Sequence, residues 1–222
     1  MGRKVKEMAK RNYQKELTKL LQQLEMETSE KKKRLFLHCC CAPCSSYVLE
    51  YLHTYFDITI FFYNPNITED KEYEKRKREL KRYLSEVSFG KEIHIADADY
   101  EPELYLERIR GHEKDRERGE RCRICFELRL QKTAEKAAEG QYDYFCTTLS
   151  ISPHKDADLL MAIGEALAGQ YGVAYLPSDF KKQNGYKRSI ELSHIYDLYR
   201  QDYCGCVFSR QQRRNEKEQT EK

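Results

Sequence analysis

The residues of this chain that are best suited to chemistry are its cysteines, because eight of the nine stand in three groups. Four of them lie within the stretch His38-Cys39-Cys40-Cys41-Ala42-Pro43-Cys44. A second group is the pair Cys122 and Cys125, and a third is the pair Cys204 and Cys206, which flank one glycine. Grouped thiolates either bind metals or cycle between thiol and disulfide, so the spacing predicts one or both of these chemistries.

The first two groups together supply enough thiolates for a tetrahedral zinc ion or an iron–sulfur cluster. Arg121 and Arg123 flank Cys122 at the start of an expected helix, and both the cations and the helix N-terminus favour thiolate over thiol. Adjacent cysteines such as Cys40 and Cys41 can ligate different irons of one cube but suit a single zinc ion poorly. The pattern therefore favours an iron–sulfur cluster between two loops.

The pair Cys204 and Cys206 can close a small strained ring because Gly205 lies between them. Strained disulfides are the more oxidising ones, so the pair is predicted to be redox-active. Two other interpretations stay open, namely further metal ligation and two independent buried thiols. Cys146, which stands alone in an apolar pattern, is predicted to be a core residue.

Charge and hydropathy exclude several protein classes. The N-terminus is charged throughout and has no apolar segment typical of a signal peptide. The longest strongly apolar run, Ile58 to Tyr63, is far shorter than the roughly 20 residues that span a bilayer. With an odd number of cysteines and no export signal, the chain is predicted to be cytoplasmic, without a membrane partner, and to keep its thiols reduced.

Strand and helix patterns alternate from Arg34 onward. Strands are expected at 35–38, 57–63, 92–96, 142–148 and 173–176, and helices at 45–56, 69–86, 101–109, 123–138, 156–168 and 187–199. This alternation predicts an α/β fold: a single Rossmann-like layer with a mostly parallel sheet flanked by helices. Ligands bind at the carboxyl ends of such strands, so a metal site is expected there, where the first cysteine group lies.

Composition predicts that the chain is divided into three segments. Residues 1–33 are predicted to be a basic N-terminal helical extension, since residues 1–34 hold eleven Lys or Arg against five Glu and leucines recur at helical spacing. Residues 34–208 form the expected catalytic α/β domain. Residues 209–222 are polar and are expected to be a disordered tail.

The cysteines belong to a set of short motifs that stand in a characteristic order along the chain. They are Leu37-His38 with Cys40-Cys41-Ala42-Pro43-Cys44, then Tyr63-Asn64-Pro65-Asn66-Ile67, Arg121-Cys122 with Cys125-Phe126, Thr147-Thr148-Leu149, Ser152-Pro153-His154-Lys155, Asp179-Phe180-Lys181-Lys182 and Tyr199-Arg200-Gln201-Asp202-Tyr203-Cys204-Gly205-Cys206. Over residues 35–208 the chain resembles the cobalamin-independent epoxyqueuosine reductase family. Cys39 is a departure from the pattern, because it adds a thiol beside the paired cysteines.

The resemblance implies reductive removal of the epoxide oxygen of epoxyqueuosine at the tRNA wobble position, which gives queuosine in the last step of its biosynthesis. It also implies a redox-active disulfide and an external electron donor. The implied ligands of a 4Fe-4S cluster are Cys40, Cys41, Cys122 and Cys125, and the implied disulfide joins Cys204 and Cys206. The candidates for an additional mononuclear iron are Cys44 and Asp156.

The sequence leaves open which residue donates the proton and which residues contact the tRNA. Removing the oxygen needs a proton donor, for which His38, His154, Asp156 and Tyr203 are candidates; His38 is equally well explained as a core residue. For tRNA, basic residues gather at 181–188 around Tyr186, and a second basic stretch at 76–82 fits a solvated helix face as well as a phosphate contact.

Two other functions are compatible with an α/β fold that carries cysteines. An iron–sulfur tRNA sulfur-transfer or ATP-pyrophosphatase-like enzyme needs a glycine-rich phosphate loop after its first strand, whereas this loop is Cys39-Cys40-Cys41-Ala42-Pro43-Cys44. The other is a zinc-stabilised RNA-binding module, which metal analysis distinguishes from an iron–sulfur reductase.

Overall fold

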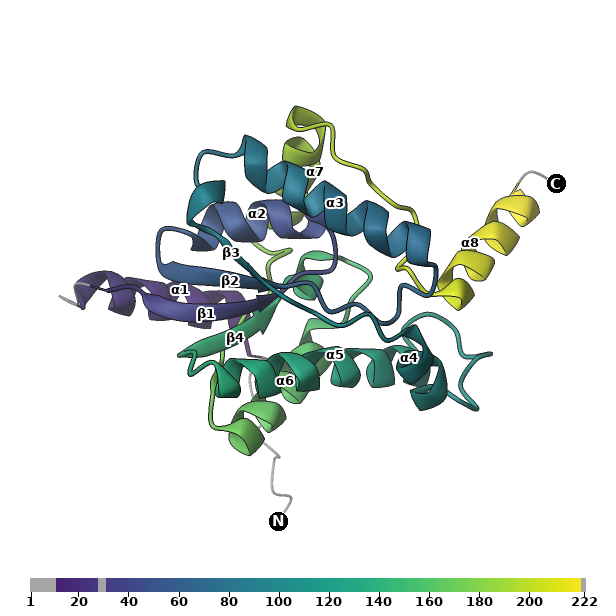
Figure 1. The fold of residues 1–222 in the computed structure, drawn as a ribbon, viewed down its shortest axis with the longest axis horizontal. Coiled ribbons are helices and arrows are strands. Elements are labelled where there is room, and N and C mark those ends of the chain that lie inside the picture. The colour runs from purple at the N-terminus through teal and green to yellow at the C-terminus, as the bar shows by residue number, and fades with distance from the viewer. Residues whose placement is uncertain (1–10, 28–30, 221–222) are drawn as a thin grey trace, which may run out of the picture.

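The computed structural model describes residues 11–27 and 31–220 and contains one sheet of five strands, every pair of which is parallel (Figure 1). The strands run in the order β3-β2-β1-β4-β5. In the register, Leu35 pairs with Ile58 on one side and with Tyr144 on the other. Their bounds are β1 Lys33–His38, β2 Phe56–Phe61, β3 His94–Ala96, β4 Tyr144–Thr147 and β5 Ala174–Tyr175.

Helices cover both faces of the sheet, which confirms the predicted α/β class. In Figure 1, α2, α3 and α7 lie on one side of the strands and α5 and α6 on the other. No helix of the described residues is long and apolar enough to cross a membrane. The helix bounds are α1 Tyr13–Met26, α2 Ala42–Leu52, α3 Asp70–Glu86, α4 Pro102–Arg108, α5 Glu120–Glu139, α6 Ala157–Tyr171, α7 Gly185–Ile195 and α8 Val207–Thr220, with single 3-10 turns at η1 Gly90–Glu92 and η2 Thr148–Ile151.

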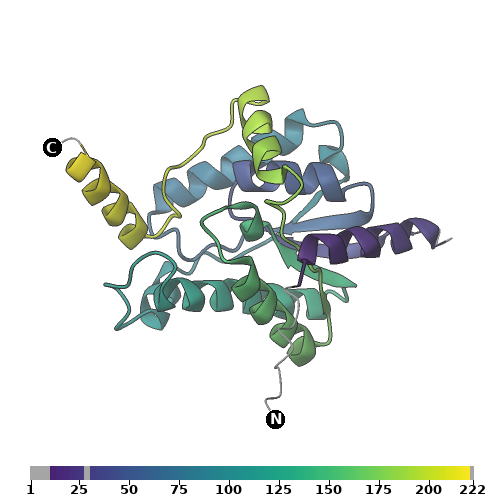
Figure 2. The same ribbon diagram turned by 180° about the vertical axis from the view of Figure 1, so that it is seen from behind.

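Alternation along the central strand divides the core into two layers. Leu35 and Leu37 of β1 point toward α2 and α3, whereas Phe36 between them points toward α5 and α6. Figure 2 shows from behind that α7 lies beside α2, and these two helices make extensive contact. The central strands are buried on both faces, as parallel strands under helical layers are.

Helix α1 lies within the segment predicted as a basic helical extension. Its Leu17 and Leu21 are buried in the same core layer as α2, and Arg11 binds Glu165 of α6 at 2.8 Å. The helix is therefore docked on the domain. Residues 1–10 and 28–30 of the predicted extension lie outside the described residues.

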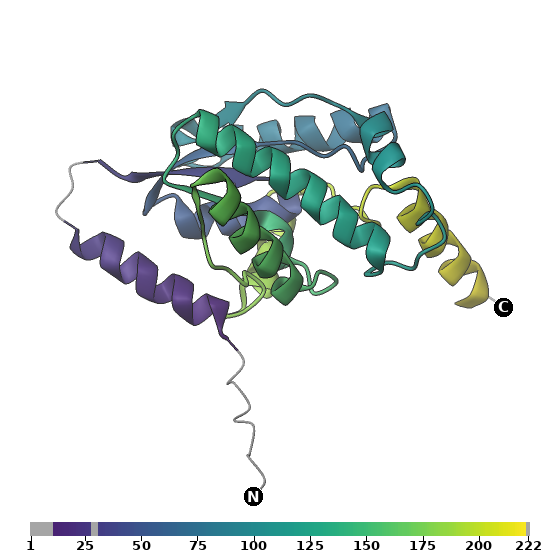
Figure 3. The same cartoon turned by 90° about the horizontal axis from the view of Figure 1, so that it is seen from below.

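The prediction of a disordered tail is wrong for residues 209–220, which belong to helix α8. Figure 3 shows α8 at the opposite end of the molecule from α1. The helix is polar nearly all round, but pairs spaced by four residues support it: Gln211 bonds Asn215 at 2.8 Å and Gln212 bonds Glu216 at 2.9 Å. Its first turn is held to the body by buried Ser209, whose hydroxyl accepts from the backbone N–H of Cys204.

Candidate metal centre and active site

The first cysteine group follows the carboxyl end of β1, where the strand order reverses. From β1 the sheet is extended on one side by β2 and β3 and on the other side by β4 and β5. Ligands bind in the crevice at the carboxyl ends of the two strands, here β1 and β4, between which the order reverses. The loop after β1 and the turn after β4 meet there, because Sγ of Cys40 lies 3.7 Å from Oγ1 of Thr148. The structure confirms that the first cysteine group lies at this edge of the sheet, and the metal site expected there stays a prediction.

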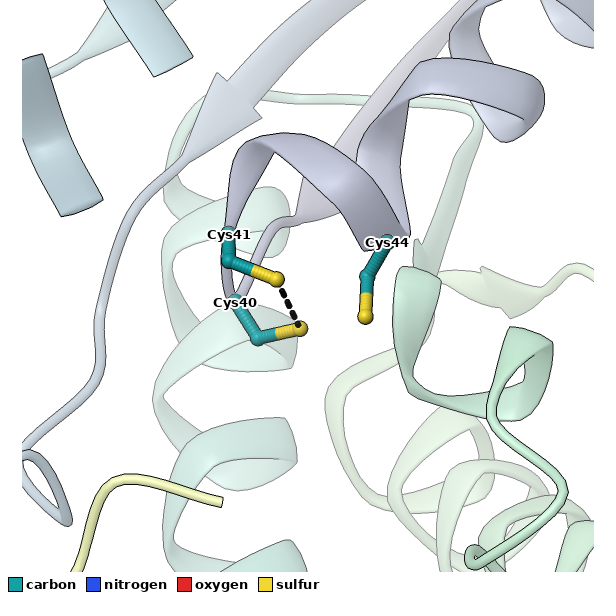
Figure 4. Close-up of side chains that lie close together, drawn as sticks. All are labelled: Cys40, Cys41 and Cys44. Carbon is teal, nitrogen blue, oxygen red and sulfur yellow. Dashed lines mark hydrogen bonds between the residues drawn. The ribbon is translucent and has the colours of Figure 1, made fainter. Parts of the chain in front are cut away.

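Three cysteines converge at this point. The sulfurs of Cys40, Cys41 and Cys44 all lie within 4.8 Å of one another, and those of Cys40 and Cys41 are 3.8 Å apart (Figure 4). In the described chain this is the only group of three or more His, Cys, Asp or Glu side chains close enough to hold a metal ion. Cys39 is not part of it: it is fully buried in the core layer beneath α2.

Local structure explains the convergence of these three sulfurs. Pro43 starts α2 immediately after the loop, so Cys41 caps the helix and Cys44 lies in its first turn. Hydrogen bonds with Cys40 and Cys44 lower the pKa of Cys41. The bond with Cys41, together with burial, raises the pKa of Cys40 to about 12, and the bonds with Cys40 and Cys41 raise the pKa of Cys44. One thiolate is thus already favoured without a metal, and a cation would be needed to ionise the other two.

His38 is a structural residue, which settles one of the sequence alternatives. It is fully buried, its Nδ1 lies 2.8 Å from Oγ1 of Thr147, and its Nε2 lies 3.0 Å from the carbonyl oxygen of Tyr63. A carbonyl only accepts, so Nε2 carries the proton. Burial, together with nearby Arg129, lowers the pKa of His38 to about 3. The imidazole is therefore neutral and is not a proton donor for a reaction.

Cys122 and Cys125 lie in the first turns of α5, as the sequence predicts. Sγ of Cys122 accepts the backbone N–H of Arg118 at 3.3 Å, and Cys125 is buried, which raises its pKa to about 12. Of the four predicted cluster ligands, the structure brings Cys40 and Cys41 together, with Cys44 beside them. It leaves the two α5 cysteines outside that group of sulfurs.

Cys204 and Cys206 are free thiols in two different environments. Cys204 lines the cavity that Cys40 and Cys44 also line, which we call the main cavity. Cys206 is buried under α8, and its sulfur accepts the N–H of Ser209 at 3.3 Å. Gly205 has φ 127°, and a Cβ there would lie 2.8 Å from Cγ1 of Ile67. Only glycine suits this position, so the turn that sets the two thiols apart depends on it.

A buried ion pair distinguishes Cys204 from Cys206. Nζ of Lys155 lies 3.2 Å from Sγ of Cys204 and 3.1 Å from Oε1 of Glu117, and the lysine is 8% exposed. Burial alone would raise the pKa of Cys204, but Lys155 and Arg129 outweigh it and lower the pKa. Burial raises the pKa of Cys206, and neighbouring Cys204 adds to the effect. Cys204 is therefore the thiol that ionises first.

The main cavity has a volume of about 220 Å³ and joins the separate groups. Cys40 and Cys44 line it from the β1 loop, and Cys204 lines it from the segment before α8. Two of the candidate proton donors, His154 and Tyr203, line it as well. Residues from three separate segments of the chain therefore line one cavity.

Asp156 lies in a neighbouring cavity, apart from Cys44. That second cavity, of about 190 Å³, is lined by Asp156 and Cys122, and His154 and Lys155 lie between it and the main cavity. The carboxylate of Asp156 caps α6 by accepting the N–H of Leu159 at 3.1 Å. The structure thus places the two residues predicted for an additional iron on different cavities.

Sequence reasoning missed two buried arginines. Arg76, which the sequence grouped with a surface basic stretch, is 2% exposed, lines the main cavity and binds Glu72 at 2.7 Å. Arg129 is 1% exposed and lines the same cavity. Its position four residues after Cys125 in a helical pattern is a signal that could have placed it beside the cysteines.

The basic segment 181–188 is divided between internal pairs and solvent. Lys181 pairs with Asp179, and Arg188 binds Glu50 at 2.8 Å. Lys182 and Lys187 are exposed, and Tyr186 between them lines the main cavity. The described segment therefore presents two lysines and one aromatic ring beside the cavity.

Comparison with known proteins places the chain in a family. The family model described as "Epoxyqueuosine reductase QueH" matches residues 35–212. The chain belongs to the QueH family. Among its curated relatives, the protein named epoxyqueuosine reductase QueH of Streptococcus pyogenes serotype M1 is 44% identical over 89% of this chain and 78% of its own length. Those of Staphylococcus aureus (strain Mu50) and Thermotoga maritima are 42% and 33% identical, over 90% and 81% of this chain and 85% and 92% of their own lengths.

The residues around the cavity of this QueH family member suit an anionic metal centre. Nη2 of Arg76 and Nη2 of Arg129 are buried and have no hydrogen-bond partner among the described residues. Buried N–H groups without partners are rare and call for an acceptor. Several thiolates that share a metal core would bring net negative charge and sulfur acceptors to the same space. The donor set and the unpaired cationic N–H groups therefore fit an iron–sulfur group.

We expect Lys155→Met to slow alkylation of Cys204 by iodoacetamide several-fold near neutral pH. The ammonium lowers the pKa of Cys204, so its removal raises that pKa, reduces the thiolate fraction and moves the pH profile of the rate upward. Peptide mass spectrometry of the reduced protein measures the rate at each cysteine. Lys182→Met, which removes an exposed lysine, is the control and leaves the rate unchanged. Equal rates in Lys155→Met and the parent protein would contradict the role of the pair.

Proposed function

We propose that this protein is an epoxyqueuosine reductase, which removes the epoxide oxygen of epoxyqueuosine at the wobble position of tRNA and yields queuosine. The observation that carries the proposal is one cavity lined by Cys40, Cys44 and Cys204, in a chain that belongs to the QueH family. The relatives named above support the same activity, since each is named for it. We place the reaction in a reducing cytosol, which suits nine free thiols.

The cofactor in this proposal is a 4Fe-4S cluster held by two loops. Cys40 and Cys41 would supply ligands from the loop after β1, and Cys122 and Cys125 from the first turns of α5. When bound, such a cluster transfers one electron at a time. Cys44 and Asp156 stay the candidates for an additional iron, with the limit that they line different cavities.

The electrons and protons of the reaction balance through the thiols of the chain. Removing the epoxide oxygen as water, with formation of a carbon–carbon double bond, consumes two electrons and two protons. Oxidation of Cys204 and Cys206 to one disulfide releases two electrons and the two thiol protons. An external donor must then reduce the disulfide before the next turnover. Cys204 lines the cavity and has the lower pKa of the two thiols, so oxidation would begin from its thiolate.

Other residues of the cavity can hold the substrate and deliver protons. Tyr186 offers a ring on which a base can stack, and Lys182 and Lys187 lie next to it in sequence with their side chains exposed to phosphates. His154 and Tyr203 line the cavity and can donate a proton to the departing oxygen. This arrangement would bring the wobble nucleoside to Cys204 while the RNA backbone stays outside.

Mass spectrometry of tRNA nucleosides tests the activity. After anaerobic incubation of reconstituted protein with epoxyqueuosine-containing tRNA and a reductant, we expect loss of epoxyqueuosine and an equal gain of queuosine. The same mixture without protein controls for chemical reduction. Unchanged epoxyqueuosine with a fully loaded metal centre and either a chemical or a protein electron donor would refute the proposal.

Metal analysis tests the cofactor separately. We expect anaerobically purified protein to be brown and to contain about four irons and four sulfides per chain. One equivalent of zinc without sulfide would instead support a zinc-stabilised RNA-binding module. The two assays are independent, so the cofactor and the activity can each fail alone.

A further inference from the structure

We propose that Arg129 is the internal countercharge of the iron–sulfur cluster and raises the cluster's reduction potential. The inference rests on the proposed 4Fe-4S cofactor and adds a role for a residue outside the ligand set.

Arg129 is a buried cation that has no acidic partner in the part of the chain that the structure describes. Its side chain is 1% exposed, and no carboxylate of the described residues forms an ion pair with it. Nε donates to the carbonyl oxygen of Cys125 at 3.2 Å, and Nη2 has no hydrogen-bond partner within residues 11–27 and 31–220. A buried charge without a counterion is strongly destabilising. The fold therefore retains a feature that is unfavourable without an anion.

Cysteines are the residues whose charge would act most strongly on this guanidinium. Arg129 lies one helical turn after Cys125 on α5 and lines the same cavity as Cys40 and Cys204. Burial alone would lower the pKa of Arg129, but Cys125, Cys204 and Cys40 outweigh it and raise the pKa. Arg129 is thus the cation common to the first, second and third cysteine groups.

Two other buried arginines show that this environment is specific to Arg129. Arg76 also lines the cavity, but its Nε binds Glu72 at 2.7 Å. Arg121, on the same helix, donates to the carbonyl oxygen of Glu113 at 2.8 Å and also to that of Asp115, and it does not line the main cavity. Arg129 alone among the three combines a place on the cavity with no acidic or loop-carbonyl partner.

The direction of the effect follows from charge. The reduced cluster carries one more negative charge than the oxidised cluster, so a fixed cation stabilises the reduced form more strongly. In a low-dielectric interior this difference is large, and it raises the reduction potential. Loss of the cation must therefore lower the potential.

The test is a redox titration of Arg129→Met, followed by electron paramagnetic resonance. We expect the ratio of reduced to oxidised cluster at a fixed potential to fall at least tenfold, which is a shift of about −59 mV for a one-electron couple. Arg129→Lys keeps the charge and should shift the ratio less. Lys136→Gln, which removes a partly exposed cation near the end of the same helix, is the matched control and should not shift it. A parental potential in Arg129→Met would overturn the inference.

The apo protein supplies a second measurement that does not depend on the cluster. Because Arg129 has no anion there, apo Arg129→Met should withstand urea at least as well as the apo parent, whereas the parent should gain more stability on cluster loading. Failure of apo Arg129→Met to fold would overturn the inference, since the guanidinium would then serve the fold itself. Zinc without sulfide in the parent protein would refute the cofactor and the inference together, while a loaded cluster with no conversion of tRNA would refute only the activity.

Discussion

Cys204→Ser and Cys206→Ser are each expected to abolish conversion of epoxyqueuosine tRNA and to leave the cluster in place. Each variant removes one half of the thiol pair that would supply two electrons, so neither can form the disulfide. We expect a loss on the order of 10³-fold or more, and no further loss in the double variant, since residues that act as one unit are not additive. Nucleoside mass spectrometry measures the loss, and iron and sulfide analysis measures the cluster.

The control for this experiment is Cys146→Ser. Sγ of Cys146 lies 3.4 Å from Oγ of Ser178 in the core, where a serine hydroxyl can form the same contact, and burial raises the pKa of this thiol to about 12. The variant should therefore keep both cluster and turnover. Normal conversion by both Cys204→Ser and Cys206→Ser would show that the pair is structural or ligates metal, the two alternatives that the spacing left open.

Loss of iron and sulfide is the second large effect, and it is expected for Cys122→Ser and Cys125→Ser. A serine is a poor ligand for an iron that prefers thiolate, so the cluster should not assemble and activity should fall with it. Iron, sulfide and visible absorbance of the anaerobically purified variants measure this. Circular dichroism shows whether the α5 helix and the rest of the fold persist.

Cys44→Ser decides between two ligand sets. The sulfur of Cys44 lies in one group with Cys40 and Cys41, but the predicted set omits it. We therefore expect Cys44→Ser to keep the full cluster. If Cys44→Ser loses the cluster while Cys122→Ser and Cys125→Ser retain it, the centre is built on the β1 loop and the predicted set is wrong.

Much of the fold could be predicted because its signals are local. The strand expected at 35–38 and the helix expected at 45–56 follow from short local patterns of apolar residues. The structure has a strand at Lys33–His38 and a helix at Ala42–Leu52, so both elements are confirmed, with shifted ends. The tail could not be predicted from composition. Polar side chains such as Gln212 and Glu216 support α8 by pairing with each other, and Ser209 anchors it to a segment that composition does not identify.

The sequence by itself determined which residues can bind metal or store electrons. Adjacency of Cys40 and Cys41, the two-residue spacing of Cys122 and Cys125 and the glycine between Cys204 and Cys206 are covalent facts, so they limit local geometry in any fold.

Only the tertiary structure decided what surrounds those thiols. Lys155 and Cys204 are 3.2 Å apart although 49 positions separate them, and Arg76, part of a charged stretch in sequence, proves to be buried at the cavity. The ionisation of a thiol depends on burial and on charges within a few ångströms, and the packing of distant segments sets both. The sequence thus specified the reactive atoms, and the fold determined which of them carry charge and face one cavity.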